Sequence, residues 1–137
     1  MFVDASAIVA MMDREPGWEA LADKVRTADE IHVSVVVLYE AAHAIARLTS
    51  GGRKPSSERI QEARETVDDF LSGLGAAVYS MDGHIGSLAI EASRRYGKAV
   101  GHPADLNMGD CFAYACAKSL GVPLLYKGED FAKTDLA

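Results

Sequence analysis

The chain has 137 residues and a formal net charge of −6, with 49% hydrophobic and 25% charged residues. This length and composition are typical of one globular domain, so we expect a single domain over residues 1–137. The negative charge disfavours a protein that coats bare nucleic acid by counterion release. No apolar run reaches the roughly 20 residues of a membrane span, and the N-terminus lacks a basic signal region. We therefore expect a cytoplasmic protein with no membrane partner.

The first half of the chain alternates short apolar strands with helices. Residues 1–4 predict a buried strand, residues 5–12 a helix, and residues 15–28 a second helix with apolar side chains at helical spacing. Residues 31–34 predict the next strand and residues 35–49 the next helix. We expect the inward face of that last helix to carry Leu38, Ala41, Ala42, Ile45 and Leu48.

The second half repeats this alternation. Residues 56–74 predict a helix, 76–80 a strand, 82–97 a helix, 108–120 a helix that is apolar almost all round, and 122–126 the last strand. Strands that alternate with helices indicate a parallel sheet covered on both faces. The sequence therefore predicts an α/β fold, a three-layer α/β/α sandwich with a central, mostly parallel sheet.

Two acidic residues come directly after predicted strands. Asp4 follows the first strand and Asp130 lies just beyond the last one. Because ligands bind outside the carboxyl ends of parallel strands, we expect both carboxylates at the same edge of the sheet. Each also has an ordinary explanation: Asp4, or Ser6 in its place, would cap the following helix, and Asp130 would be a turn residue.

Two further acids lie on predicted helices. Glu40, in VVVLYEAAHAI, falls opposite the apolar face of its helix, in one stripe with His43 and Arg47. The ordinary alternative is a solvated acid that pairs with Arg47. Asp110, in LNMGDCFAY, stands at the start of the apolar helix, where it would complete a capping box with Asn107 and face the positive helix end.

Taken together, the four carboxylates predict a metal site. Converging anions would repel one another by several kcal/mol at an effective dielectric of about 20, unless a multivalent cation lies among them. Neither the two cysteines nor the four histidines show metal-ligand spacing. An all-oxygen ligand set suits Mg²⁺ or Mn²⁺, and Mg²⁺ usually shares its shell with phosphate oxygens. We therefore expect phosphoryl chemistry with a metal-activated water.

The sequence resembles the PIN-domain ribonucleases, and among them the VapC toxins of bacterial and archaeal toxin–antitoxin pairs. MFVDASAIVA, residues 1–10, is similar to the N-terminal strand of the family with its D-x-S/T signature. HPADLNMGDCFAYACAKSLGVPLLYKGEDF, residues 102–131, is similar to the most specific block of the family. The resemblance extends from Met1 to the last residues of the chain.

The resemblance implies a Mg²⁺-dependent endoribonuclease, the toxin of a type II toxin–antitoxin pair, in which a metal-activated water hydrolyses RNA, commonly a structured RNA. Two of the acids, Asp4 and Asp110, are the expected metal ligands. Ser6 would hold a carboxylate or a water in place, and Asn107 would cap the helix of Asp110 or support the metal ligands. The resemblance implies that one acidic quartet holds the ion: Asp4, Glu40, Asp110 and Asp130.

Basic residues are expected to bind RNA around this acidic pocket, first Arg47, Arg53 and Lys54. Further candidates are Arg94, Arg95, Lys98, His102 and Lys127. For each of them, the alternative is a solvated surface charge.

The resemblance also implies two protein partners. One is a small VapB-like antitoxin, whose C-terminal segment would wrap a groove beside the early helices, and the other is a second copy in a homodimer. The early helices carry more apolar residues than a short helical hairpin needs, although these also suit the core. They are Ile8, Val9, Met11, Met12, Trp18 and Leu21.

Two other function classes compete with the ribonuclease. A non-catalytic RNA- or partner-binding module on the same fold would bind RNA without cleaving it and would ignore a chelator, but the complete set of four acids disfavours it. A phosphatase of the haloacid dehalogenase type needs a second acid two residues after its nucleophile. That position is Ser6 here.

Overall fold

The computed structural model describes residues 1–136 and contains a four-stranded sheet in the order β3-β2-β1-β4. The strands are β1 (Phe2–Val3), β2 (His32–Ser34), β3 (Ala77–Tyr79) and β4 (Leu124–Leu125), and every pairing between them is parallel. Phe2 is in register with His32 on one side and with Leu124 on the other. The prediction of a parallel α/β sheet is confirmed.

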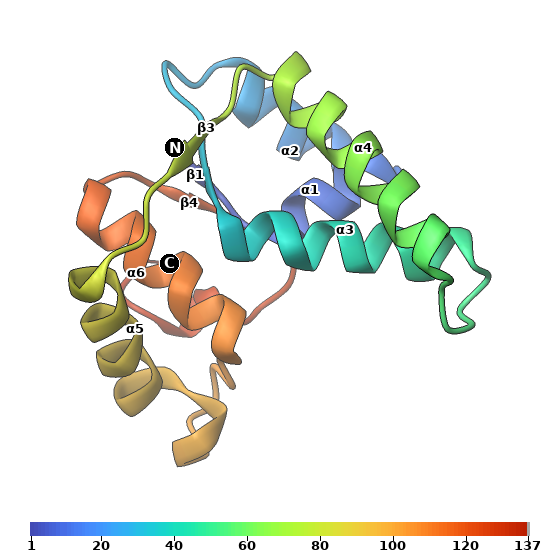
Figure 1. The fold of residues 1–137 in the computed structure, drawn as a ribbon. Coiled ribbons are helices and arrows are strands. Elements are labelled where there is room, and N and C mark those ends of the chain that lie inside the picture. Colours follow the sequence, from blue (N-terminus) through green and yellow to red (C-terminus); the bar gives the residue numbers. More distant parts are fainter. Residues whose placement is uncertain (137) are drawn as a thin grey trace.

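Helices cover both sides of the sheet. They are α1 (Ala5–Met12), α2 (Trp18–Arg26), α3 (Val35–Thr49), α4 (Ser57–Gly73), α5 (Gly83–Tyr96) and α6 (Met108–Leu120). Helices α1 to α4 gather to the right of the strands in Figure 1, and α5 and α6 lie to the lower left, as expected for the predicted three-layer sandwich. None of the helices within residues 1–136 is long and apolar enough to cross a bilayer.

The helices begin at polar capping residues, which is why most of their starts were predictable. The side chains of five residues accept hydrogen bonds from first-turn backbone N–H groups: Asp4, Ser34, Ser56, Asp82 and Asn107. Helix α2 differs from the prediction, because it begins only after Gly17, whose φ of 87° is left-handed, and ends at Arg26. Two short 3₁₀ turns, Lys98–Val100 and Phe131–Lys133, were not predicted.

The predicted inward face of α3 was wrong at Leu48, which is 46% exposed. The buried stripe of α3 advances in steps of four residues, through Val37, Ala41 and Ile45. At about 100° per residue Leu48 points between Val37 and Ala41, so its exposure does not come from the direction it faces. The buried residues of α3 end at Ala46, and Leu48 lies in the last turn of the helix, beyond the core.

The early helices contribute more to the core than to the surface. Ile8, Met11 and Leu21 are buried, so for these three the core alternative holds. Trp18 is half-buried. Of the apolar surface that the sequence predicted for a partner, only part is exposed.

Candidate active site

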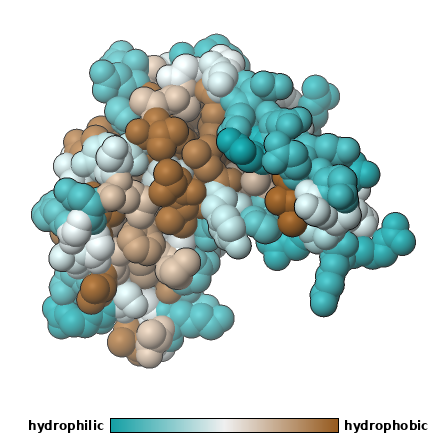
Figure 2. Space-filling view, in the orientation of Figure 1, coloured by the Kyte–Doolittle hydropathy of each residue, from teal (hydrophilic) through white to brown (hydrophobic). Residues whose placement is uncertain are grey.

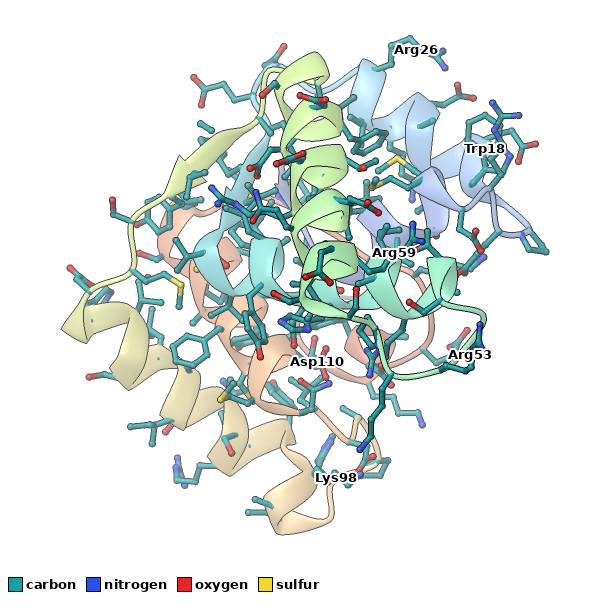
Figure 3. All side chains as sticks on the ribbon, turned by 45° about the vertical axis from the view of Figure 1, so that its right-hand side comes forward. Trp18, Arg26, Arg53, Arg59, Lys98 and Asp110 are labelled. Carbon is teal, nitrogen blue, oxygen red and sulfur yellow. The ribbon has the colours of Figure 1, made fainter. Side chains whose placement is uncertain are left out.

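A cleft of about 590 Å³ opens at the carboxyl edge of the sheet, where β1 and β4 end. Its walls come from the starts of α1 and α6, from one face of α3 and from the loop after β4. Asp110 lies near the centre of the view in Figure 3, at the start of α6. The structure brings all four acids singled out by the sequence into this cleft: Asp4, Glu40, Asp110 and Asp130.

Asp4 is the most deeply buried of the four, with 4% of its surface exposed. Its Oδ2 accepts hydrogen bonds from the Ser6 backbone N–H at 2.9 Å and from the Ser6 hydroxyl at 2.5 Å, so it caps α1 while facing the cleft. Burial raises the pKa of Asp4 and the Asp130 carboxylate adds to this, against the opposing hydrogen bonds from Ser6 and Ala5.

Ser6 joins two segments of the cleft. Its hydroxyl donates to Asp4 and accepts from the backbone N–H of Lys127 at 3.0 Å. The backbone N–H of Asp4 also donates to the Leu125 carbonyl at 2.9 Å. The start of α1 and the loop that leads to Asp130 are therefore held together by hydrogen bonds.

Asp110 forms the predicted capping box with Asn107. The Asn107 side chain accepts from the Asp110 N–H at 3.2 Å, and the Asp110 Oδ2 accepts from the Asn107 N–H at 2.8 Å. Burial raises the pKa of Asp110 to about 6, helped by the Asp4, Asp130 and Asp105 carboxylates and opposed by the Asn107 hydrogen bond. Asp110 is therefore both a capping residue and a half-buried anion in the cleft.

Glu40 reaches the cleft from the middle of α3 and lies against Gly109. A Cβ atom at position 109 would overlap the Glu40 carboxyl group. Burial raises the pKa of Glu40 to about 7, and the Asp4 and Asp110 carboxylates add to the shift. Among the ion pairs of residues 1–136 there is none between Glu40 and Arg47, so the solvated-pair alternative does not describe this acid.

The donor chemistry of the cleft fits a hard divalent cation. Only oxygen ligands come from the four acids. The pKa of Glu40 and that of Asp110 are raised first by burial and then by neighbouring carboxylates, and no basic side chain lowers either of them. Within the described residues, no three Asp, Glu, His or Cys side chains are placed so that they could hold a metal ion together. Shared ligation would require the carboxylates to turn toward one point.

The structure separates the three expected RNA contacts. Arg47 lines the cleft, whereas Arg53 and Lys54 lie on the exposed loop between α3 and α4 and do not line it. Their neighbour Pro55 does line the cleft, so this loop borders it. In Figure 3, Arg53 lies to the right of Asp110.

Of the further basic candidates, only Lys127 lines the cleft, where its ammonium donates to the Pro16 carbonyl. The others lie outside the cleft lining. Arg94 pairs with Glu91, and Lys98, below Asp110 in Figure 3, lies 3.9 Å from Asp105. That these residues contact RNA stays a prediction.

Two side chains of the cleft that carry a polar group were missed in the sequence. Tyr39 precedes His43 by four positions on α3 and so lies on the same stripe as Glu40 and His43. This spacing could have predicted that Tyr39 lines the cleft. Glu15 reaches the cleft through the turn between α1 and α2, for which the sequence carries no signal.

The chain is similar to known proteins over its whole length. The model of the PIN domain family matches residues 1–136. A VapC ribonuclease of Rhizobium meliloti (strain 1021) is 49% identical over 139 residues, which cover 98% of both chains. Ribonuclease VapC42 of Mycobacterium tuberculosis (strain ATCC 25618 / H37Rv) is 35% identical over 136 residues, 99% of this chain and 96% of its own.

A solved structure shares the fold. The crystal structure of Mycobacterium tuberculosis VapC20, described as a sarcin-ricin loop cleaving toxin, matches with a TM-score of 0.69 and 15% sequence identity, over 96% of this chain and 92% of its own. At 15% identity this similarity supports only the fold. The family assignment depends on the whole-chain sequence matches. This chain belongs to the PIN-domain family and, within it, to the VapC ribonuclease toxins.

Proposed function

We propose that this chain is a metal-dependent endoribonuclease whose acidic cleft cuts phosphodiester bonds in RNA. The main support for the mechanism is that carboxylates from four separate segments line a single cleft. Burial and mutual repulsion raise the pKa of three of them, Asp4, Glu40 and Asp110. Because ionised carboxylates gathered in this way repel one another, the arrangement suits a site that binds a divalent cation together with phosphate.

Asp4 and Asp110 are the residues that would hold Mg²⁺, or Mn²⁺ in its place, with Glu40 and Asp130 completing the acidic set. A divalent ion bound there supplies a nucleophilic water and neutralises charge on the phosphate. The structure supports these assignments by fixing the two proposed ligands: Ser6 anchors Asp4 through two hydrogen bonds, and the Asn107 capping box anchors Asp110.

Basic residues at the rim would bind the RNA backbone. Arg47 and Lys127 line the cleft and are placed to contact phosphates next to the cut. Arg53 and Lys54, on the bordering loop, would contact the RNA further away. The net charge of −6 makes such local contacts necessary, because the chain as a whole repels a polyanion.

The test is cleavage of labelled RNA by the purified protein with Mg²⁺, with Mn²⁺ and with EDTA. We expect cleavage with either metal, none with EDTA, and a loss of at least about 1,000-fold in Asp4→Asn and Asp110→Asn, since metal catalysis supplies several kcal/mol. Asp69→Asn, an exposed acid on α4, is the matched control and stays active. Cleavage that survives EDTA and both variants would overturn the mechanism. RNA binding without cleavage would favour the non-catalytic module.

The substrate class proposed is a structured RNA cut at few sites. VapC20, which shares the fold, is described as cleaving the sarcin-ricin loop, so ribosomal RNA and tRNA both belong in the test. Sequencing of new RNA ends after induced expression would locate the cut. Many cuts without a common structure would contradict this substrate class.

The proposed antitoxin is a small VapB-like protein, which would occupy a groove of about 380 Å³ between α2 and α4. Apolar side chains that suit a docked peptide helix line this groove, among them Trp18, Ala22, Phe70 and Leu74. The protein encoded beside this chain should co-purify with it and suppress cleavage, and Trp18→Ala should weaken the complex. Inhibition that is indifferent to Trp18 would place the antitoxin elsewhere.

A homodimer is the expected assembly. Figure 2 shows hydrophobic residues gathered over the middle of one face. Large apolar side chains that are more than half exposed include Val35, Val78, Ile90, Val100 and Met108. Several exposed apolar side chains are typical of an interface between two copies of a chain. Light scattering of the purified protein measures its mass in solution and so shows whether it is a dimer.

A further inference from the structure

We propose that Tyr39 is a platform on which an unpaired RNA base stacks beside the cleaved phosphate. The inference rests on the proposed ribonuclease function and adds the kind of RNA that the cleft selects. Tyr39 lines the acidic cleft, yet 66% of its surface is exposed. Tyrosine combines a large apolar ring with a polar hydroxyl and is enriched at binding surfaces, where one end is apolar and the other wet. Its exposure rules out a main role in packing the core.

The orientation of the ring is fixed by a neighbour. The ring centroids of Tyr39 and His43 lie 4.3 Å apart, with their planes at 46°. Because the residues are four positions apart on α3, the imidazole supports one side of the phenol ring while most of the ring stays open to solvent. A supported and exposed ring is preorganised for stacking, since little side-chain entropy is left to lose.

A stripe on α3 continues this platform along the cleft. Tyr39, His43 and Arg47 occupy positions i, i+4 and i+8, and all three line the cleft. They span about 12 Å of the helix. Glu40 follows Tyr39 directly, so the aromatic ring stands next to the acids proposed to hold the metal. RNA laid along α3 would meet the ring, the imidazole and the guanidinium in turn.

Stacking would also supply binding free energy that electrostatic attraction cannot supply in this acidic cleft. Its acidic wall and the net charge of −6 oppose the phosphate backbone, so electrostatic attraction cannot supply all of the affinity. Stacking of a base on an aromatic ring does not depend on charge. It requires a base whose face is free, which a paired base inside a duplex does not offer. The cleft is therefore built to prefer single-stranded or loop RNA.

The test measures binding separately from cleavage. The probe is a fluorescent 12-nucleotide RNA of mixed sequence, either single-stranded or annealed to its complement, titrated with protein in EDTA. We expect Tyr39→Leu, which keeps an apolar side chain without a ring, to weaken single-strand binding by about 5- to 100-fold. Duplex binding should not change. Tyr39→Phe keeps the ring and should bind within about twofold of the parent.

Three further measurements decide the interpretation. Leu48→Ala, at a residue of the same helix that is 46% exposed and outside the cleft lining, is the control and should bind like the parent. In cleavage assays with Mg²⁺, Tyr39→Leu should raise KM more than it lowers kcat, whereas a structural defect would lower the melting temperature. If the parent binds RNA through Tyr39 but never cleaves it, the proposed ribonuclease function is wrong. The proposal that Tyr39 stacks on an RNA base is then still supported.

Two outcomes would overturn the platform itself. One is equal single-strand binding by Tyr39→Leu and the parent. The other is a change in mass of Tyr39→Leu by light scattering that accounts for its loss of binding, because Tyr39 would then belong to an interface between two copies of the chain.

Discussion

The carboxyl group of Glu40 lies against the backbone of Gly109, in the space that any side chain at position 109 would need. Gly109 is buried in the first turn of α6, and Glu40 comes from the middle of α3. The backbone of Gly109 is not in the left-handed region. The requirement for glycine is therefore one of space, because the missing side chain lets Glu40 reach the other acids.

Gly109→Ala should displace Glu40 and lower kcat/KM for RNA by about 100-fold, since misplacing a catalytic group by about 1 Å has that effect. The fold should persist, because alanine favours a helix more than glycine does. The measurement is cleavage of labelled RNA together with the melting temperature.

A double-mutant cycle shows whether Gly109 acts through Glu40. In Glu40→Ala the space is free, so adding Gly109→Ala should cause no further loss of activity. Gly86→Ala is the matched control, because a Cβ atom there meets nothing within 4 Å and the residue lies inside α5. Independent losses that multiply in the double variant would contradict the mechanism.

Neutralising one acid should stabilise the metal-free protein. Because the pKa of Glu40 is raised to about 7 by burial and by the Asp4 and Asp110 carboxylates, its ionised form destabilises the fold. Glu40→Gln should raise the melting temperature in EDTA at pH 8 by about 2 to 4 °C, equivalent to about 1 kcal/mol. Adding Mg²⁺ should stabilise the parent more than the variant. A parent more stable than Glu40→Gln in EDTA would disprove the repulsion.

Ser6→Ala should damage both stability and activity. Its hydroxyl is bonded to Asp4 at 2.5 Å and to the Lys127 N–H at 3.0 Å, so the change removes two hydrogen bonds and should lower the free energy of unfolding by about 1 to 2 kcal/mol. Cleavage should fall about 10-fold as Asp4 loses one anchor. Ser87→Ala, whose hydroxyl bonds within α5 to the Gly83 carbonyl, is the control, and Ser6→Thr should restore part of the activity.

Local chemistry made much of the site predictable. Asp4 caps the helix that follows it and Asp110 completes the capping box of its own helix, so their positions depend on neighbouring residues. A parallel sheet brings the ends of β1 and β4 to one edge. Asn107 could be assigned to the capping box from its spacing to Asp110. These inferences needed only the rules of helix capping and the rule that the ends of parallel strands meet at one edge of the sheet.

The rest depends on how helices pack against one another. Only the packing of α3 against α6 shows that Glu40 occupies the space beside Gly109. Tyr39 lies in the cleft because of the rotation of α3 about its axis, which helical spacing defines to within one residue at best. Leu48 is exposed because the core ends at Ala46, one turn before the end of that helix. Arg53 and Lys54 are exposed and lie outside the cleft lining, although Pro55 of the same loop lines it, and sequence spacing cannot resolve such a difference within one loop.

A cluster nearer the C-terminal end of α6, outside the cleft lining, should contribute to the acid stability of the chain. Asp135 accepts a hydrogen bond from the Tyr114 hydroxyl at 2.7 Å and lies 2.9 Å from the Lys118 ammonium. These contacts, and the more distant Arg95, lower the pKa of Asp135 to about 2. A carboxylate with a lowered pKa stabilises the fold when it is ionised, so this stabilisation is complete above its ordinary pKa of 3.8 and is lost as the pH falls toward 2.

Asp135→Asn should therefore lower the free energy of unfolding by about 1 kcal/mol at pH 6, a value reduced for the partial exposure of the pair to solvent. The difference between parent and variant should stay constant from about pH 5 to pH 8 and shrink as the pH falls from about 4 toward 2. Urea unfolding of both proteins across this range measures it. RNA cleavage should be unchanged, because Asp135 does not line the cleft. A difference that persists at pH 2.5 would show that Asp135 acts through its shape and not through its charge.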